Sequence, residues 1–230
     1  MEIAAITGLE AEARIARRAG FAAHASGGIA VQTFSAAEAY LAQGVHTLLS
    51  FGIAGALAPH LVPGTLLLPR AVVEESGTRR MVDAGWRARL AEALAAAGLH
   101  AEPGDLLGAD EAAASRARKA ALFAATGAVA IDLESHIIAR SAAHAGGSFV
   151  VLRAVADPAE RDLPPAALDG LGPAGTPAVG RVFQSVLRHP GQIVPLIRLA
   201  ADTRCALLAL RSALEQRPSP SGAPSGSIAR

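Results

Sequence analysis

The chain has little of several residue types on which particular kinds of protein depend. Cys205 is the only cysteine among 230 residues, so neither an intrachain disulfide nor a cysteine-based zinc site can form. The formal net charge is only +1, which gives no reason to expect a nucleic-acid partner. Lysine is nearly absent too, since Lys119 is the only one among 21 basic residues. Apolar residues, by contrast, make up 51% of the chain, which is ample material for a core.

Charge is missing altogether from the long stretch between Glu38 and Arg70. A membrane helix requires about this length, but glycines and prolines such as Gly55 and Pro63 interrupt the stretch. A buried parallel strand, a glycine-rich turn and a second strand explain it better. The amino terminus lacks the basic region of a signal peptide. We therefore expect a cytoplasmic protein and leave open a contact with the inner face of the cytoplasmic membrane.

Short apolar runs alternate with helical patterns along most of the chain, which predicts an α/β fold with a mostly parallel sheet. Residues 1–216 are expected to form one domain. Residues 217–230 are rich in Pro, Ser and Gly and are expected to be a disordered tail. The predicted strands are 3–7, 29–34, 45–52, 64–69, 128–131 and 148–156. The predicted helices are 9–18, a segment capped by Ser35 that runs to Leu41, 86–97, 112–125, 135–145, 179–187 and a last one from Pro190 to about Gln216.

Acidic residues follow three of the predicted strands. Glu10 and Glu12 come after the first strand, Asp132 and Glu134 after "AVAI", and Asp157 after "SFVVLRAVA". Ligands of open parallel sheets bind outside the carboxyl ends of the strands, so these acids could meet in one cleft. Each of them, taken singly, could equally cap the helix that follows it.

Three segments resemble the purine nucleoside phosphorylase and nucleosidase superfamily. "MEIAAITGLEAEA" is similar to the amino terminus of methylthioadenosine/S-adenosylhomocysteine nucleosidases, and "SFGIAGALAPHLVPGTLLLP" to their glycine-rich turn and following strand. "AIDLESHIIARSAAHAGGSFVVLRAVADPAE" resembles their ribose-binding segment and the strand that carries the base-contacting aspartate. The resemblance implies a three-layer α/β/α sandwich with a mixed, largely parallel sheet, and a homo-oligomer. It implies neither a metal nor a cofactor, although inorganic phosphate is a co-substrate of the phosphorylases.

Within this superfamily, "DLESH" and "VLRAVADPAERDLPPAAL" resemble the branch associated with hopanoid biosynthesis. Members of that branch are thought to release adenine from adenosylhopane. By this resemblance Asp157 is the general acid at N7 of adenine. Glu134 accepts hydrogen bonds from the ribose hydroxyls and stabilises the cationic sugar. Asp132, in the same ribose-binding segment, is expected to have a structural role next to the residues that contact the ribose. Leu133 is expected to form an apolar wall for the sugar.

The acceptor of the ribosyl group is left open between water and phosphate. Glu12 matches the glutamate that activates water in the nucleosidases. Phosphorylases use a clamp made of a glycine turn, arginines and a hydroxyl, and the hydroxyl position falls here on Ile53, which is apolar. These two residues favour hydrolysis. The same clamp segment, with Arg153, is expected to form the pocket for the base and the nucleophile: Phe51, Gly52, Ile53, Ala54 and Gly55. Arg153 lies in an apolar strand and must find an anion, either an interior carboxylate or phosphate.

The base site departs from the nucleosidases, because the segment "GADEAAAS" has no aromatic residue to stack on adenine. Phe51 is the expected substitute, whereas His136 is expected to be structural. A hopanoid substrate would need an apolar groove, for which the apolar and arginine-rich segment around 182–204 is the candidate. Two alternatives stay open: a housekeeping methylthioadenosine/S-adenosylhomocysteine nucleosidase or general purine nucleoside phosphorylase, and a non-catalytic hopanoid-binding protein.

Overall fold

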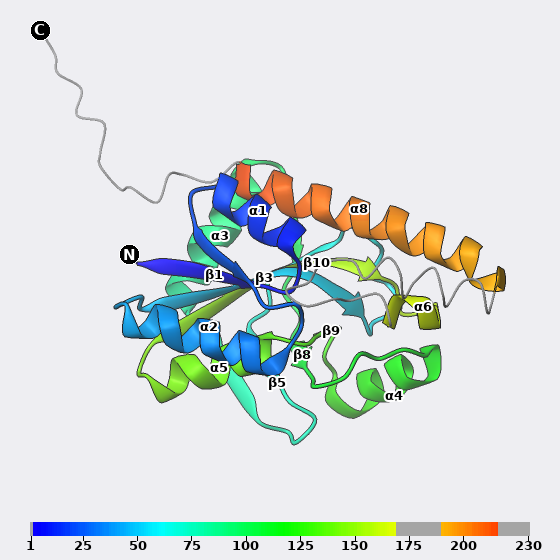
Figure 1. The fold of residues 1–230 in the computed structure, drawn as a ribbon, viewed down its shortest axis with the longest axis horizontal. Helices are drawn as coiled ribbons and strands as arrows, with labels where there is room; N and C mark the ends of the chain where they lie inside the picture. Colours follow the sequence, from blue (N-terminus) through cyan, green and yellow to red (C-terminus); the bar gives the residue numbers. More distant parts are fainter. Residues whose placement is uncertain (1, 169–189, 216–230) are drawn as a thin grey trace, which may run out of the picture.

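The computed structural model describes residues 2–168 and 190–215 as a mixed sheet between two layers of helices (Figure 1). The helices are α1 (Glu10–Arg18), α2 (Ala30–Ala42), α3 (Ala84–Ala96), α4 (Arg116–Thr126), α5 (Ser135–His144), α6 (Pro165–Leu168) and α8 (Ile193–Glu215), which follows the 3₁₀ turn Pro190–Gln192. The strands are β1 (Ile3–Thr7), β2 (Ala22–Ala25), β3 (Thr47–Ala56), β4 (Leu66–Leu67), β5 (Ala71–Val73), β6 (Arg79–Met81), β7 (Ala101–Glu102), β8 (Leu106–Gly108), β9 (Ala130–Asp132) and β10 (Ser148–Asp157). The predicted three-layer α/β sandwich is confirmed.

The strands of the described residues form one ten-stranded sheet in the order β6-β5-β8-β9-β3-β10-β4-β7, and β1 and β2 join it beside β3. β3 and β10 are its parallel centre and run side by side from Ser148 opposite Thr47 to Asp157 opposite Gly55. The first half of β3 pairs with β1, and its end pairs with the antiparallel strand β9. The end of β3 therefore lies between β9 and β10, beyond the end of β1.

Helices cover both faces of the sheet. α1, α3 and α8 bury one face, where Ala16, Leu90 and Leu210 pack against Leu49 and Leu152. α2 and α5 cover the other face, with Ala37 and Ile138 against Leu48 and Val151. α4 closes a smaller cluster through Leu122, beside β8 and β9. Figure 1 shows α1 and α8 on one side of the sheet and α2 and α5 on the opposite side.

The structure corrects the prediction for residues 29–34, which form no strand. Residue 29 precedes α2 as its N-cap and residues 30–34 belong to the helix. The buried residues Thr33, Ala36 and Ala37 recur at helical spacing, whereas Val31 and Phe34 are 73% and 52% exposed. The apparent strand pattern came from apolar side chains that point to solvent. Ser35 consequently lies inside the helix and does not cap it. The preceding strand is β2, and Gly27 and Gly28, both with positive φ, separate it from the helix.

A second correction concerns "FGIAG". These residues continue β3 as far as Ala56, and they form no glycine-rich turn. β4 is shorter than predicted, at two residues, and α4 begins four residues later than predicted, at Arg116 after the capping residue Ser115. The predicted helix 179–187 and the tail 217–230 lie outside the described residues. Among the described helices, none is both long and apolar enough to cross a membrane.

Candidate functional site

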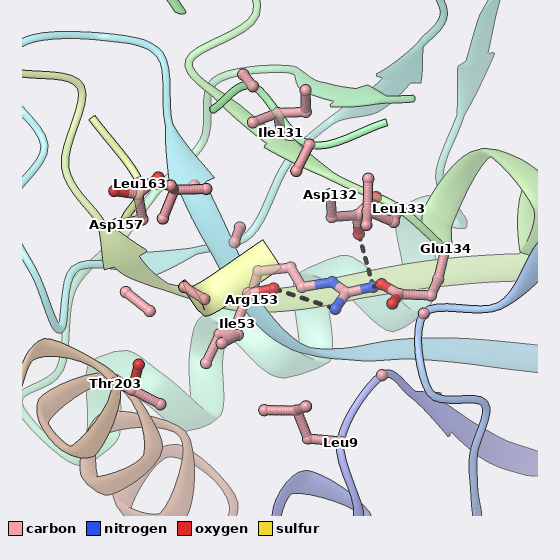
Figure 2. A pocket seen from close by; sticks show the side chains of 18 of the residues that line it. Leu9, Ile53, Ile131, Asp132, Leu133, Glu134, Arg153, Asp157, Leu163 and Thr203 are labelled. Atoms are coloured by element: carbon pink, nitrogen blue, oxygen red, sulfur yellow. Dashed lines mark hydrogen bonds and ion pairs between the residues drawn. The ribbon is translucent and has the colours of Figure 1, made fainter. Parts of the chain in front are cut away.

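A cavity of about 400 Å³ opens at the end of β3 (Figure 2). Four acidic side chains line it: Glu12 from α1, Asp132 from the end of β9, Glu134 immediately before α5, and Asp157 from the end of β10. The expectation that acids from three strand ends share one cleft is therefore met, with β9 antiparallel to its neighbour β3. Glu10, by contrast, pairs with Arg17 on the surface.

Glu12 is almost fully buried and is held by main-chain donors on both oxygens. Oε2 accepts a hydrogen bond from the backbone N–H of Leu9 at 2.7 Å, which caps α1, and Oε1 accepts one from Ile53 at 2.8 Å. Burial raises the pKa of Glu12 from its ordinary 4.5 to about 7, although Arg153 and the two backbone donors oppose the shift. At neutral pH this carboxyl can therefore both accept and release a proton.

Arg153 finds interior carboxylates, one of the two partners expected for it. Its Nη2 lies 2.6 Å from Asp132 Oδ2 and 2.9 Å from Glu134 Oε2, and all three side chains are buried. Arg153 also donates to Ser50 Oγ at 2.7 Å and to the carbonyl oxygen of Ile53 at 3.2 Å. One guanidinium thus holds Asp132, at the end of β9, and Glu134, at the start of α5, together at the cavity.

Asp132 and Glu134 differ in what they do around that guanidinium. Asp132 accepts hydrogen bonds from the backbone N–H and the hydroxyl of Ser135, so it also caps α5. Glu134 has no such cap bond. Burial raises the pKa of Glu134, and Arg153 opposes the shift. A Cβ at Gly8 would lie 2.7 Å from Glu134 Oε1, so only glycine leaves room for this carboxylate.

Asp157 ends β10 at an irregularity of the strand. Val155 pairs with Ala54 and Asp157 with Gly55, so Ala156 is an extra residue on β10. This bulge lets both Ala156 and Asp157 line the cavity, which a regular strand would not allow. Burial raises the pKa of Asp157, and a lysine on α4 opposes that shift.

That lysine, Lys119, is a residue that the sequence reasoning missed. Its Nζ lies 2.6 Å from Asp157 Oδ2 and donates to the carbonyl oxygens of Pro158 at 2.9 Å and Arg161 at 2.7 Å. The side chain is completely buried. The signal that could have found it is its singularity, because it is the only lysine where the composition otherwise supplies arginine.

The other predicted pocket residues divide into two groups. Leu133, Ile53, Ala54 and Gly55 line the cavity, as does Arg153. Phe51 does not: it is fully buried in the apolar cluster under α1 and α8, so it cannot cover an adenine ring. Gly52 stands beside the cavity and makes room for the carboxylate of Glu12. His136 lies elsewhere, with Nε2 3.0 Å from Asp110.

The remaining walls of the cavity are mostly glycines and apolar side chains. Gly27 and Gly28, which the sequence reasoning did not single out, both line the cavity, and Gly28, with a φ of +70°, lies beside Glu134. The opposite side is formed by residues of the 158–168 segment and α8, namely Leu163, Ala167, Leu199 and Thr203. No three His, Cys, Asp or Glu side chains of the described residues gather where they could hold a metal ion.

Comparisons with known proteins agree with this architecture. The model of the Phosphorylase superfamily matches residues 22–188. Among solved structures, the methylthioadenosine/S-adenosylhomocysteine nucleosidase of Helicobacter pylori has a TM-score of 0.68 and 16% identity over 94% of this chain and 98% of its own. The corresponding nucleosidase of Neisseria meningitidis has a TM-score of 0.69 and 16% identity, over 94% and 97%.

A third solved structure has another activity. The futalosine hydrolase of Helicobacter pylori has a TM-score of 0.66 and 16% identity over 94% of this chain and 98% of its own. At these identities the likeness establishes the fold. A search of curated protein sequences found no match.

Proposed function

Because the chain belongs to the phosphorylase superfamily, a family of nucleoside-cleaving enzymes, we propose that it hydrolyses the N-glycosidic bond of an adenine nucleoside. The observation that carries the proposal is that Glu12, Glu134 and Asp157 line one cavity. Cleavage of this bond needs a group that protonates the base, a negative charge near the ribose as it becomes cationic, and a group that activates the nucleophile. The three carboxyl groups provide these functions.

Asp157 protonates N7 of the base, because burial raises its pKa and because it lies at the end of β10, where it lines the cavity. Glu134 accepts hydrogen bonds from the ribose hydroxyls, and its charge stabilises the cationic sugar in the transition state. Glu12 removes a proton from the attacking water, because a base works best when its pKa is near the working pH. Asp132 acts through Arg153, whose position it fixes.

Water is favoured over phosphate as the acceptor. A phosphate ion would need free cationic or N–H donors, but Arg153 already pairs with Asp132 and Glu134. The backbone N–H of Ile53 is engaged by Glu12, and the side chain of Ile53 offers no hydroxyl. A phosphate would also stand among several carboxylates, where like charges repel. A water molecule meets none of these obstacles.

The apolar wall formed by Leu163, Ala167 and Leu199 supports a substrate whose 5′ substituent is apolar. α8, which contributes Leu199 to this wall, carries the exposed apolar side chains Ile193, Val194 and Ile197 near its beginning. Together with the resemblance to the hopanoid-associated branch, this favours adenosylhopane as the substrate and adenine with ribosylhopane as the products. An elongated hydrocarbon would lie along α8, close to where the substrate would enter from a membrane surface.

The test is a reaction of purified protein with adenosylhopane, in phosphate-free buffer and again with added phosphate, followed by mass spectrometry. We expect adenine and ribosylhopane without phosphate. Adenine that forms only with phosphate, together with phosphoribosylhopane, would make the protein a phosphorylase. Release of adenine from methylthioadenosine alone would make it a housekeeping nucleosidase.

Matched variants separate an enzyme from a binding protein. Glu12→Gln should abolish adenine release, whereas Glu10→Gln, on the same helix turn but paired with Arg17 at the surface, should leave it unchanged. If wild-type protein binds adenosylhopane but releases no adenine, the result would favour the non-catalytic alternative.

A further inference from the structure

Lys119 combines complete burial with saturated hydrogen bonding. An ammonium group has three N–H donors, and Nζ meets three acceptors: Asp157 Oδ2, the carbonyl oxygen of Pro158 and that of Arg161. Two of these acceptors belong to the segment that follows β10, so one side chain fixes both the carboxylate and its surroundings. α4, which carries Lys119, is otherwise exposed on its outer side, for example at Arg118.

The charges of this pair constrain how Asp157 can work. A buried ammonium ion is costly without a counter-charge, and Asp157 provides the only carboxylate that the described residues bring to Nζ. A general acid must nevertheless hold a proton. The two requirements are compatible if the proton is shared, because a carboxylate with an ammonium and a carboxylic acid with a neutral amine contain the same number of protons. Neither arrangement leaves a buried charge unpaired.

We propose that Lys119 is a positioning residue that holds Asp157 toward the base and supplies the proton that Asp157 donates. The proposal rests on the proposed function. Nζ first passes a proton to Oδ2, which leaves a neutral amine beside a carboxylic acid. As the bond between C1′ and N9 breaks, its electron pair passes to the purine, N7 takes the proton of Asp157, and the amine then regains a proton from solvent. Water gives its oxygen to C1′ and its proton to Glu12, which releases it, so the protons balance.

Several other charged groups lie near the pair, and the two that act on Asp157 oppose each other. Arg161, on the segment after β10, lowers the pKa of Asp157, and Asp202 on α8 raises it; the two form an ion pair with each other. The adjoining pocket between this segment, α4 and α8 contains further charged side chains: Arg116, Glu160, Asp162 and Arg198. All of these side chains are present both in the wild type and in a Lys119 variant, so they cannot cause a difference between the two proteins.

The decisive experiment is the pH dependence of kcat in Lys119→Met, which removes the charge at similar volume. Without Lys119, Asp157 must carry the proton by itself, so activity should fall at lower pH than in the wild type. At about pH 8 we expect kcat to be reduced about 100-fold, the lower range for general acid catalysis, with KM changed little. At lower pH, where Asp157 takes up a proton from solvent, the two proteins should converge. Arg118→Met, on the exposed side of the same helix, is the control.

The opposite shift would overturn the proposal. If Lys119 only lowers the pKa of Asp157, its removal raises that pKa, and activity would persist to higher pH than in the wild type; an unchanged profile would be equally contradictory. If Lys119→Met does not fold, the double variant Lys119→Met/Asp157→Asn removes both charges. The kcat of the double variant should then equal that of Asp157→Asn. A lower kcat in the double variant would show that Lys119 and Asp157 act independently, which would contradict the proposal. Wild-type protein that cleaves no nucleoside at any pH would instead contradict the proposed function.

Discussion

A carbon atom added at the Cβ position of Gly52 would lie 2.7 Å from the carboxylate of Glu12. The position also has a φ of +155°, which side chains rarely adopt. Glu12 can therefore reach the backbone N–H of Ile53 only because residue 52 has no side chain. This hydrogen bond between residues 41 positions apart joins α1 to the central strand β3 at the cavity.

Gly52→Ala should disturb Glu12 and abolish most of the activity. We also expect a loss of about 1–3 kcal/mol in the free energy of unfolding, since the added methyl group overpacks a closed site. Chemical denaturation and an adenine-release assay measure the two effects. Gly44→Ala is the control, because Gly44 has a φ of +80° but no atom within 4 Å of the added Cβ. It should lose stability and keep activity; equal activity in both variants would contradict the prediction.

The acidic side of the pH–activity profile should be set by Glu12. The carboxyl must be deprotonated to accept a proton from water, and its pKa is about 7. Activity should therefore rise with pH through about 7, and kcat/KM should fall about tenfold for each unit below it. A profile that stays flat down to pH 5 would show that another group, or no base at all, activates the nucleophile.

The free energy of unfolding should fall as Glu12 loses its proton, whereas activity should rise. The folded pKa of Glu12, about 7, lies above its ordinary 4.5, so its favourable contribution is fully present below 4.5 and is lost as pH rises through 7. Glu12→Gln does not titrate. The stability of this variant relative to the wild type should therefore improve by about 3 kcal/mol between pH 4.5 and pH 8. Urea denaturation at both pH values measures the change, and a constant difference would refute it.

The sequence predicts best those parts of the fold that are long and buried. β1, α5 and β10 come out within one residue of the structure, because continuous apolar runs and the helix stop at Ala145–Gly146 mark them. β5 to β8 went unpredicted, since strands of two or three residues carry too little pattern. The strand predicted for residues 29–34 was wrong, because an alternating apolar pattern does not distinguish a buried face from an exposed one.

The site follows the same division. The acidic residues that follow strands could be recognised in the sequence, and Glu12, Glu134 and Asp157 do line one cavity. Contacts between distant residues were not: the pairing of Lys119 with Asp157 spans 38 residues and depends on how α4 packs beside the end of β10. Phe51 was misplaced because residues on β3 alternate between the two faces, and its ring points into the core.

Asp157→Asn should slow the cleavage of adenine nucleosides by about 100-fold or more, because the amide cannot donate a proton as an acid does. The effect should be small for a ribofuranoside whose leaving group, such as 4-nitrophenolate, departs without protonation. Asp105→Asn is the matched control, since Asp105 pairs with Arg79 on the surface away from the cavity. Equal slowing of both substrates by Asp157→Asn would assign Asp157 to ribose binding or structure.

The apolar wall of α8 should determine affinity for the 5′ substituent. Leu199→Gln places a polar amide where a hydrocarbon would lie, so KM for adenosylhopane should rise about tenfold, as expected from the loss of about 1.5 kcal/mol of apolar contact. KM for adenosine, which lacks this substituent, should stay unchanged. Leu208→Gln on the same helix is the control, because Leu208 is exposed and does not line the cavity. If Leu199→Gln raises KM equally for both substrates, the wall contacts the nucleoside itself, and the hydrocarbon must leave the cavity by another side.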